Sequence, residues 1–193
     1  LSMLFTEAPL LERFERAERA GFAAVELQFP YDTPAEQLQQ ALFRNKLTLV
    51  LHNLPAGDWA AGERGIACLP ARVGEFQDGV GKAIEYAQAL GCQQINCLAG
   101  IGPKDAVPDA LRKTFVENLK FAAGKLKGVG IRLLIEPINI FDIPGFYLSR
   151  TAQALEIMND VCSDNLFLQY DVYHMQRTEG ELAASLKNHL ART

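Results

Sequence analysis

Short apolar runs alternate with longer amphipathic segments along the whole chain. Brief apolar runs are typical of strands buried in a parallel sheet, and the amphipathic segments are typical of helices that cover such a sheet. The predicted strands are Leu1–Phe5, Ala24–Leu27, Thr48–His52, Gln94–Leu98, Arg132–Glu136 and Leu166–Asp171. The predicted helices are Leu10–Ala20, Pro34–Asn45, Ala71–Leu90, Asp109–Lys127, Thr151–Val161 and Gly180–Arg192. Six successive βα units predict a parallel α/β fold without an internal domain boundary.

Such a sheet is either open and doubly wound or closed into a (β/α)8 TIM barrel. An open dinucleotide-binding sheet would carry a glycine fingerprint after its first strand, where this chain has Thr6-Glu7-Ala8-Pro9. Polar residues also recur at the strand ends, as at Glu26, His52, Glu136 and Asp171. Because a barrel gathers the carboxyl ends of its strands at one rim, we expect the TIM barrel.

The length of the chain falls short of a complete barrel. An eight-unit barrel usually has about 250 residues, and this chain has 193. We therefore expect residues 1–193 to form a single TIM-barrel domain that covers about the first six βα units and lacks the last two. An open sheet of six strands would expose strand edges, which natural proteins avoid, so we expect the chain to be part of a longer protein.

Composition excludes several classes of protein. With 49% hydrophobic and 22% charged residues the chain can bury one sizeable core. The net charge is −4 and the basic residues are scattered, so we expect no binding of nucleic acid. No apolar stretch approaches the roughly 20 residues that a membrane span needs, and no charged region precedes the apolar start. The four cysteines are widely separated, as in a protein with reduced thiols, and we expect a cytoplasmic location.

Two carboxylates, Glu136 and Asp171, end predicted strands, and His174 follows three residues after the second. A charged side chain at the end of an apolar run is costly to desolvate unless a cation or hydrogen-bond donors meet it. Strand-end carboxylates converge in a barrel, so the pair predicts a metal site. The structural alternatives are a salt bridge from Glu136 to an arginine at the bottom of the barrel and a helix cap at Asp171.

Several short motifs occur in an order and spacing that resemble one family. They are Leu1-Ser2-Met3-Leu4-Phe5, Phe29-Pro30-Tyr31, Pro55-Ala56-Gly57-Asp58, Gly62-Glu63-Arg64-Gly65, Ala99-Gly100, Glu136-Pro137-Ile138-Asn139 and Asp171-Val172-Tyr173-His174. On these residues the chain resembles the hydroxypyruvate isomerases, in the wider xylose isomerase-like TIM-barrel superfamily of sugar isomerases and epimerases. The Pro-Ala-Gly-Asp motif is the one that separates this group from the general epimerases.

The resemblance implies an aldose–ketose isomerase that interconverts hydroxypyruvate and tartronate semialdehyde through an enediol. It implies Glu136 and Asp171 as ligands of a divalent metal ion, Mg2+ or Mn2+, with Glu136 also acting as the catalytic acid or base. The family has a second glutamate on the eighth strand and a further metal ligand on the seventh, both outside these 193 residues. We therefore expect neither tight metal binding nor turnover from these residues alone.

Three residues are candidates for binding the substrate, which we expect to be a small hydroxy or oxo acid. His174 resembles the family histidine that hydrogen-bonds a substrate oxygen, although it could instead cap the loop into the next helix. Asp142 occupies the place of an acidic residue that contacts substrate in related epimerases. Arg64 is the candidate partner of the substrate carboxylate, with Lys104 or a residue outside this chain as alternatives.

The long loop Asn53–Leu69 has two interpretations. It closes over the substrate, with Trp59 excluding water, or it is a packed Ω-loop that Trp59 anchors. His52 either faces the pocket or is a packed histidine at the barrel rim. Glu26 either supports a neighbouring group through a hydrogen bond or lies in the pocket wall, where its carboxylate orients a ligand, and we do not expect it to bind the metal directly.

The alternative function on the same metal site is isomerisation or epimerisation of a longer 2-oxo sugar acid, such as 2-oxo-tetronate. A third class, the DNA-repair relatives on this barrel, uses a zinc cluster rich in histidine. The chain has only 3 histidines and a negative net charge, which disfavours that class. The resemblance also suggests a homo-oligomer.

Overall fold

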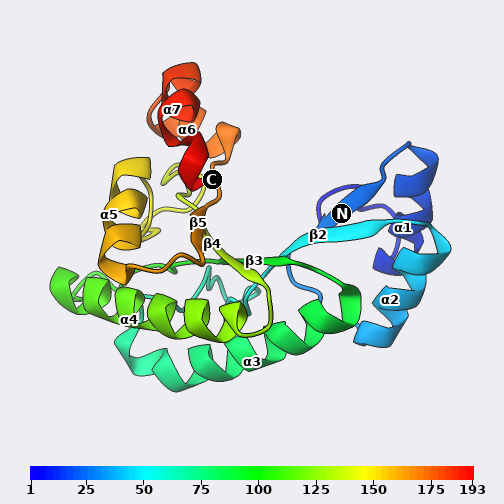
Figure 1. Cartoon of the computed structure of the whole chain (residues 1–193), viewed down its shortest axis with the longest axis horizontal. Coiled ribbons are helices and arrows are strands. Elements are labelled where there is room, and N and C mark those ends of the chain that lie inside the picture. Colours follow the sequence, from blue (N-terminus) through cyan, green and yellow to red (C-terminus); the bar gives the residue numbers. More distant parts are fainter.

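The computed structural model describes residues 1–193, and its centre is one parallel sheet of five strands in the order β1-β2-β3-β4-β5. The strands are β1 (Ala24–Leu27), β2 (Thr48–Asn53), β3 (Gln94–Cys97), β4 (Arg132–Ile135) and β5 (Leu166–Leu168). Each strand pairs in parallel with the next along the chain. All the carboxyl ends therefore lie along one rim, and the sheet curves (Figure 1).

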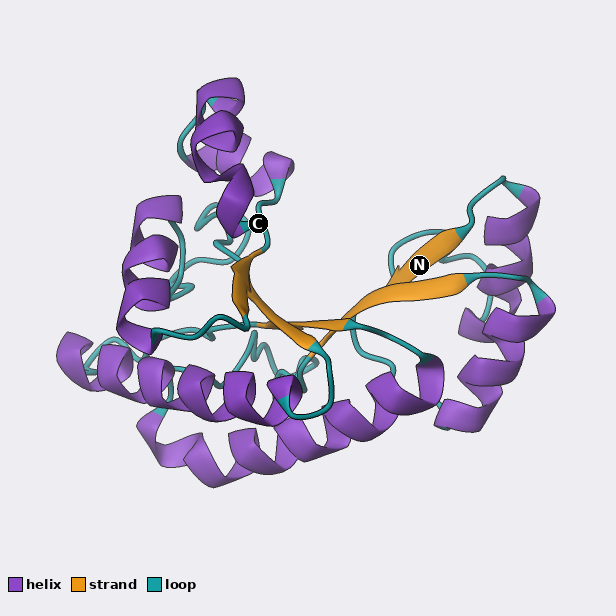
Figure 2. Ribbon diagram, viewed as in Figure 1, coloured by secondary structure: helices purple, strands orange, loops and turns teal.

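Helices cover the outer side of this curved sheet (Figure 2). The covering helices are α1 (Leu10–Arg19), α2 (Ala35–Arg44), α3 (Val73–Leu90), α4 (Pro108–Lys127) and α5 (Thr151–Val161). Helices α6 (Val172–Thr178) and α7 (Leu182–His189) lie beyond the end of β5, and short 3-10 helices are present at Pro70–Arg72 and Leu190–Arg192. In α4, residues spaced by three or four positions form one apolar face: Leu111, Phe115, Leu119, Ala122 and Leu126 are all buried. This stripe packs on β4 and is part of one hydrophobic core of 42 buried residues.

The predicted strand Leu1–Phe5 was wrong, because this segment forms turns. Phe5 has a left-handed backbone (φ +56°), which interrupts an extended chain, and the Leu4 amide donates to the Leu1 carbonyl at 3.3 Å. The segment still lies beside the end of β1, since the Leu1 amine donates to the Glu26 carbonyl and Ser2 Oγ accepts from the Gln28 amide. The sheet thus has five strands where six were predicted.

The chain after β5 also differs from the prediction. The strand ends at Leu168, three residues before Asp171, and the short helix α6 follows at Val172–Thr178 without having been predicted. Helix α6 buries only Met175, so it lacks the apolar stripe that identifies longer helices. The other predicted helices are present, with small differences at their ends.

Two glycines let the loop after β2 lie directly on the end of β3. Gly65 forms an antiparallel bridge with Ala99, and Cys68 donates its amide to the Ala99 carbonyl at 2.8 Å. Gly65 has φ +112°, and a Cβ there would collide with the Leu98 carbonyl. Gly100 has φ +107°, and a Cβ there would collide with the Gly65 carbonyl. Only glycine permits this close approach of two backbones.

The four cysteines are free thiols, as predicted; Cys68, Cys92 and Cys97 are buried and Cys162 is exposed. None of the helices combines the length and the apolar character needed to cross a bilayer.

Candidate metal centre and active site

Glu136 follows β4 directly and is buried, with 7% of its surface exposed. Its Oε2 accepts a hydrogen bond from Asn96 Nδ2 at 2.9 Å, and no lysine, arginine or histidine forms an ion pair with it. The predicted alternative, a salt bridge to an arginine, is therefore absent. Burial, and then the negative charges of Asp171 and Glu26, raise the pKa of Glu136 to about 8. A cation at this carboxylate would remove most of that penalty.

A short chain of buried amides holds Glu136. Asn53 on β2 and Asn96 on β3 are register partners, and Asn96 Nδ2 donates both to Asn53 Oδ1 at 3.1 Å and to Glu136 Oε2. Hydrogen bonds from the side chains of Asn96 and Gln169 keep the pKa of Glu136 lower than burial alone would set it. The amide oxygens of Asn96 and Gln169 are buried without a partner. Two unpaired oxygens beside a buried carboxylate suit a ligand that provides positive charge or hydrogen-bond donors.

Asp171 is the N-cap of α6, so the helix-cap alternative is what the structure contains. Its Oδ1 accepts from the backbone amides of Tyr173 at 2.7 Å and His174 at 3.2 Å. Its Oδ2 makes no hydrogen bond within the chain. Capping and metal binding are compatible, because the cap uses one oxygen, orients the carboxylate and leaves the other oxygen available.

The ends of β4 and β5 bring the predicted residues together. One ligand atom each from Glu136, Asp171 and His174 lie within 4.8 Å of one another, and no other cluster of three or more such residues is found in the chain. Hard divalent cations prefer carboxylate oxygens. The donors present therefore fit a divalent cation between Glu136 and Asp171.

Asp142 lies close to this cluster but is occupied by neighbouring side chains. Its Oδ2 accepts from Asn139 Nδ2 at 2.9 Å and from the Tyr173 hydroxyl at 2.7 Å, and its Oδ1 accepts from Arg177 Nη1 at 2.7 Å. The hydrogen bonds from Asn139 and Tyr173 lower the pKa of the Asp142 carboxyl. Asp142 thus joins the segment after β4 to α6, and its contact with substrate stays a prediction.

Arg64 is also engaged within its own loop. Its Nη1 donates to the carbonyls of Trp59 at 3.0 Å and Glu63 at 2.7 Å, and its guanidinium lies 4.0 Å from the centre of the Trp59 ring. Its role toward a substrate carboxylate stays a prediction. Lys104 is exposed.

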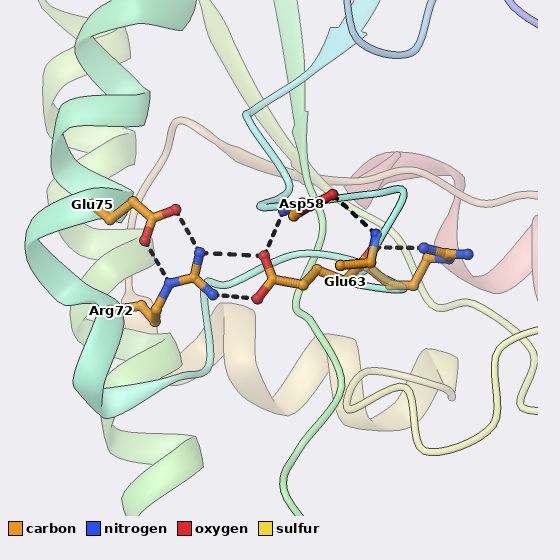
Figure 3. A network of polar contacts seen from close by, with 6 residues as sticks. Asp58, Glu63, Arg72 and Glu75 are labelled. Carbon is orange, nitrogen blue, oxygen red and sulfur yellow. Dashed lines mark hydrogen bonds and ion pairs between the residues drawn. The ribbon is translucent and has the colours of Figure 1, made fainter.

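The loop after β2 has the contacts of a packed loop. Trp59 packs on Phe29 with ring centres 4.9 Å apart. Figure 3 shows Glu63 between the guanidinium of Arg72 and the backbone amide of Asp58, with Arg72 also bound to Glu75. A cavity of about 640 Å³ lies beside the loop, lined by Gln28, Phe29, Tyr31, Trp59 and others, but not by the metal-site residues.

His52 and Glu26 lie outside the cluster. His52 is completely buried, and its Nδ1 lies 3.2 Å from both the Tyr31 hydroxyl and the Asn53 carbonyl. Burial lowers the pKa of His52 to about 4, so the ring is neutral. The contacts of Nδ1 are those of a packed rim histidine, whereas Nε2 is buried without a hydrogen-bond partner, so a role of His52 in the pocket stays a prediction. Glu26 lies on β1, across the sheet from the metal-site residues.

Sequence reasoning missed the amides that support Glu136 and His174. Asn96, Gln169 and Asn139 touch or approach these residues, and none was predicted to be functional. One signal was present for Asn96, because an amide in the middle of the apolar run Gln94–Cys97 must find partners inside the sheet.

Comparisons with known proteins agree with this fold. The model of the family "Xylose isomerase-like TIM barrel" matches residues 14–192. The chain is 57% identical to hydroxypyruvate isomerase of Escherichia coli (strain K12), covering 96% of this chain and 72% of the relative. It is 44% identical to 2-oxo-tetronate isomerase of Cupriavidus necator, covering 99% of this chain and 74% of the relative.

Among solved structures, the AP endonuclease family 2 protein of Brucella melitensis superposes with a TM-score of 0.92 at 41% identity. That match covers 95% of this chain and 71% of the solved chain. The five parallel strands and their outer helices are accordingly part of a TIM barrel. The chain belongs to the xylose isomerase-like TIM-barrel family.

Proposed function

We propose that this protein is an aldose–ketose isomerase that interconverts hydroxypyruvate and tartronate semialdehyde at a divalent metal site. The observation that carries the proposal is the convergence of Glu136 and Asp171 at the ends of β4 and β5. The 57% identity to a hydroxypyruvate isomerase supports the choice of substrate.

The reaction moves a proton between two neighbouring carbons. A base removes a proton from C3 of hydroxypyruvate, an enediol forms, and a proton is delivered to C2 while the carbonyl group moves to C3. Glu136 is suited to this transfer because it follows β4 at the rim of the sheet. Its pKa of about 8 describes the metal-free site, and a bound cation would lower that pKa and leave a carboxylate that can accept the proton. Its hydrogen bond from Asn96 holds the carboxylate in one orientation.

Glu136 and Asp171 would hold the metal ion, with oxygen donors that suit Mg2+ or Mn2+. When bound, such an ion supplies positive charge that stabilises the negative oxygen of the enediolate. Asp171 is fixed for this role by its cap on α6.

A longer substrate is the second candidate. The 44% identity to a 2-oxo-tetronate isomerase supports isomerisation of a four-carbon 2-oxo acid on the same carboxylates. Product analysis with three-carbon and four-carbon substrates separates the two activities, because the pocket length and not the metal site distinguishes them.

We also propose that residues 1–193 are part of a (β/α)8 barrel whose other three strands lie outside these residues, because the structure has five strands and not the six that were predicted. The coverage of 72% of the E. coli relative and the unpaired outer edges of β1 and β5 support this. An intact mass of 21.3 kDa for the natural protein would contradict it.

The test is isomer formation in D2O by protein of verified length, with hydroxypyruvate and Mn2+. We expect deuterium in the product, and a loss of turnover by roughly 10³-fold in Glu136→Gln and Asp171→Asn. Glu75→Gln is the control, because Glu75 is an exposed carboxylate on α3 away from the cluster. Normal turnover in Glu136→Gln would overturn the proposal.

A further inference from the structure

The contact between Asn139 and His174 determines which nitrogen of the histidine carries its proton. Asn139 is completely buried three residues after Glu136, and its Nδ2 lies 2.7 Å from His174 Nδ1. An amide nitrogen is only a donor, whereas an imidazole nitrogen is either a donor or an acceptor. The protonation of His174 therefore follows from the orientation of the Asn139 amide.

Three further contacts fix that orientation. Asn139 Oδ1 accepts from the backbone amides of Phe141 at 3.1 Å and Asp142 at 2.9 Å, and Nδ2 donates to Asp142 Oδ2 at 2.9 Å. Rotating the amide by 180° would set its NH2 group against two backbone N–H groups. The same rotation would set its oxygen against the Asp142 carboxylate. The amide therefore presents its nitrogen to His174.

We infer that Asn139 selects the tautomer of His174, with Nδ1 accepting from the Asn139 amide and the proton of the ring on Nε2. Nδ1 uses its lone pair to accept from Asn139, and Nε2 of a neutral ring then carries the hydrogen. Neither nitrogen has a free lone pair. A cation at the cluster is left with the oxygens of Glu136 and Asp171.

The surrounding contacts hold this arrangement in place. Asp142, which accepts from Asn139, is bound by Tyr173 and Arg177 on either side of His174 in α6. The segment after β4 and helix α6 are thereby joined at the histidine. Asn139 is a positioning residue in this scheme, and the donor role of His174 toward a substrate oxygen rests on the proposed isomerase function.

The direct test is 15N NMR of the imidazole nitrogens in histidine-labelled protein without metal or substrate. Residues 1–193 contain three histidines, and His174→Gln identifies the signals of His174 in the whole protein by their loss. We expect a proton coupled to Nε2 and an acceptor-type shift for Nδ1. A proton on Nδ1 instead would overturn the inference.

Variants sharpen this test. Asn139→Asp keeps the oxygen that accepts from residues 141 and 142 but replaces the donor with an acceptor, so we expect a proton on Nδ1 of His174. Asp142→Asn leaves the donor in place, so we expect the wild-type pattern. Asn159→Asp, an exposed position on α5, controls for the added charge. If Asn139→Asp does not fold, the spectra of the wild-type protein and of Asp142→Asn still show which nitrogen of His174 carries the proton.

A titration with Mg2+ tests whether either ring nitrogen of His174 binds the metal ion. The proton coupled to Nε2 is expected to persist at saturation, and its loss would show His174 to be a ligand. In turnover assays, Asn139→Asp should lower kcat roughly 10–100-fold without weakening Mg2+ binding. The NMR result does not need turnover, so an inactive wild-type protein with the expected tautomer would refute only the proposed function.

Discussion

Two regions of the same rim differ in whether their buried or partly buried glutamates have a cationic partner. In the loop after β2, Glu63 is bound by Arg72 and by the Asp58 amide, and Arg72 also binds Glu75 (Figure 3). At the ends of β4 and β5, Glu136 has no cationic partner, and the amide oxygens of Asn96 and Gln169 are buried without any partner. The first region is complete by itself, whereas the second requires a ligand.

The two glutamates show what this difference means. Hydrogen bonds from Arg72 lower the pKa of Glu63, whereas burial and neighbouring carboxylates raise the pKa of Glu136 to about 8. One glutamate, Glu63, thus stabilises a loop, whereas the other, Glu136, is in an environment that favours binding a proton or a cation. Satisfied charges indicate a structural role, and unsatisfied ones indicate a binding site.

The largest expected effect comes from replacing Glu136. Glu136→Gln should reduce turnover by roughly 10³-fold, yet raise the melting temperature of the metal-free protein at pH 8. The folded-state pKa of about 8 lies above the usual 4.5, so this carboxyl costs stability as the pH rises through that interval. Glu63→Gln should do the opposite, lowering stability and sparing kcat. If both variants changed the melting temperature in the same direction, or lost kcat to the same extent, the difference between the two glutamates would be contradicted.

Close backbone packing should make Gly65 far more sensitive than Gly62. Gly65→Ala combines a strained φ with a collision against the Leu98 carbonyl, and we expect a loss of about 3 kcal/mol. Gly62 also has a positive φ but open space around it, so Gly62→Ala should lose about 1 kcal/mol. Urea denaturation measures both, and equal losses would show that the loop does not lie tightly on β3.

Metal binding should release a proton from Glu136. Below its pKa of about 8 the carboxyl is mostly protonated, so binding must displace the proton. Apparent affinity for Mn2+ should therefore rise about tenfold between pH 6 and pH 7. Calorimetry in two buffers of different ionisation enthalpy counts the protons, and an affinity independent of pH would contradict a raised pKa.

The smallest effect is expected for Arg72, whose ion pairs are partly exposed. Arg72→Gln should lower the free energy of unfolding by about 1 kcal/mol and leave Mn2+ affinity unchanged. Arg112→Gln, which breaks an exposed pair with Asp160, should cost less. A marked loss of metal binding in Arg72→Gln would show that the two regions are coupled.

The sequence allowed much of the fold to be predicted, because five buried strands are short apolar runs and five long helices have apolar faces. Leu1–Phe5 has the composition of a strand, but the left-handed turn at Phe5 depends on local contacts that composition does not show. Helix α6 was missed because a short helix with one buried residue has no periodic pattern.

The pairing of Glu136 with Asp171 could also be predicted, since parallel strands bring their carboxyl ends together. The roles of Asn96 and Asn139 could not. They depend on strand register and on which end of an amide faces a neighbour, and both are set by tertiary contacts. Asp142 shows the same limit, because its partners Tyr173 and Arg177 lie more than thirty residues further along the chain.

The most direct measurement is a crystal structure with Mn2+, in which anomalous scattering locates the ion. We expect one peak within coordination distance of carboxylate oxygens of both Glu136 and Asp171, with no bond to His174. Saturating Mn2+ that gives no peak there, or an ion bound elsewhere on the rim, would contradict a metal centre built on these two strand ends.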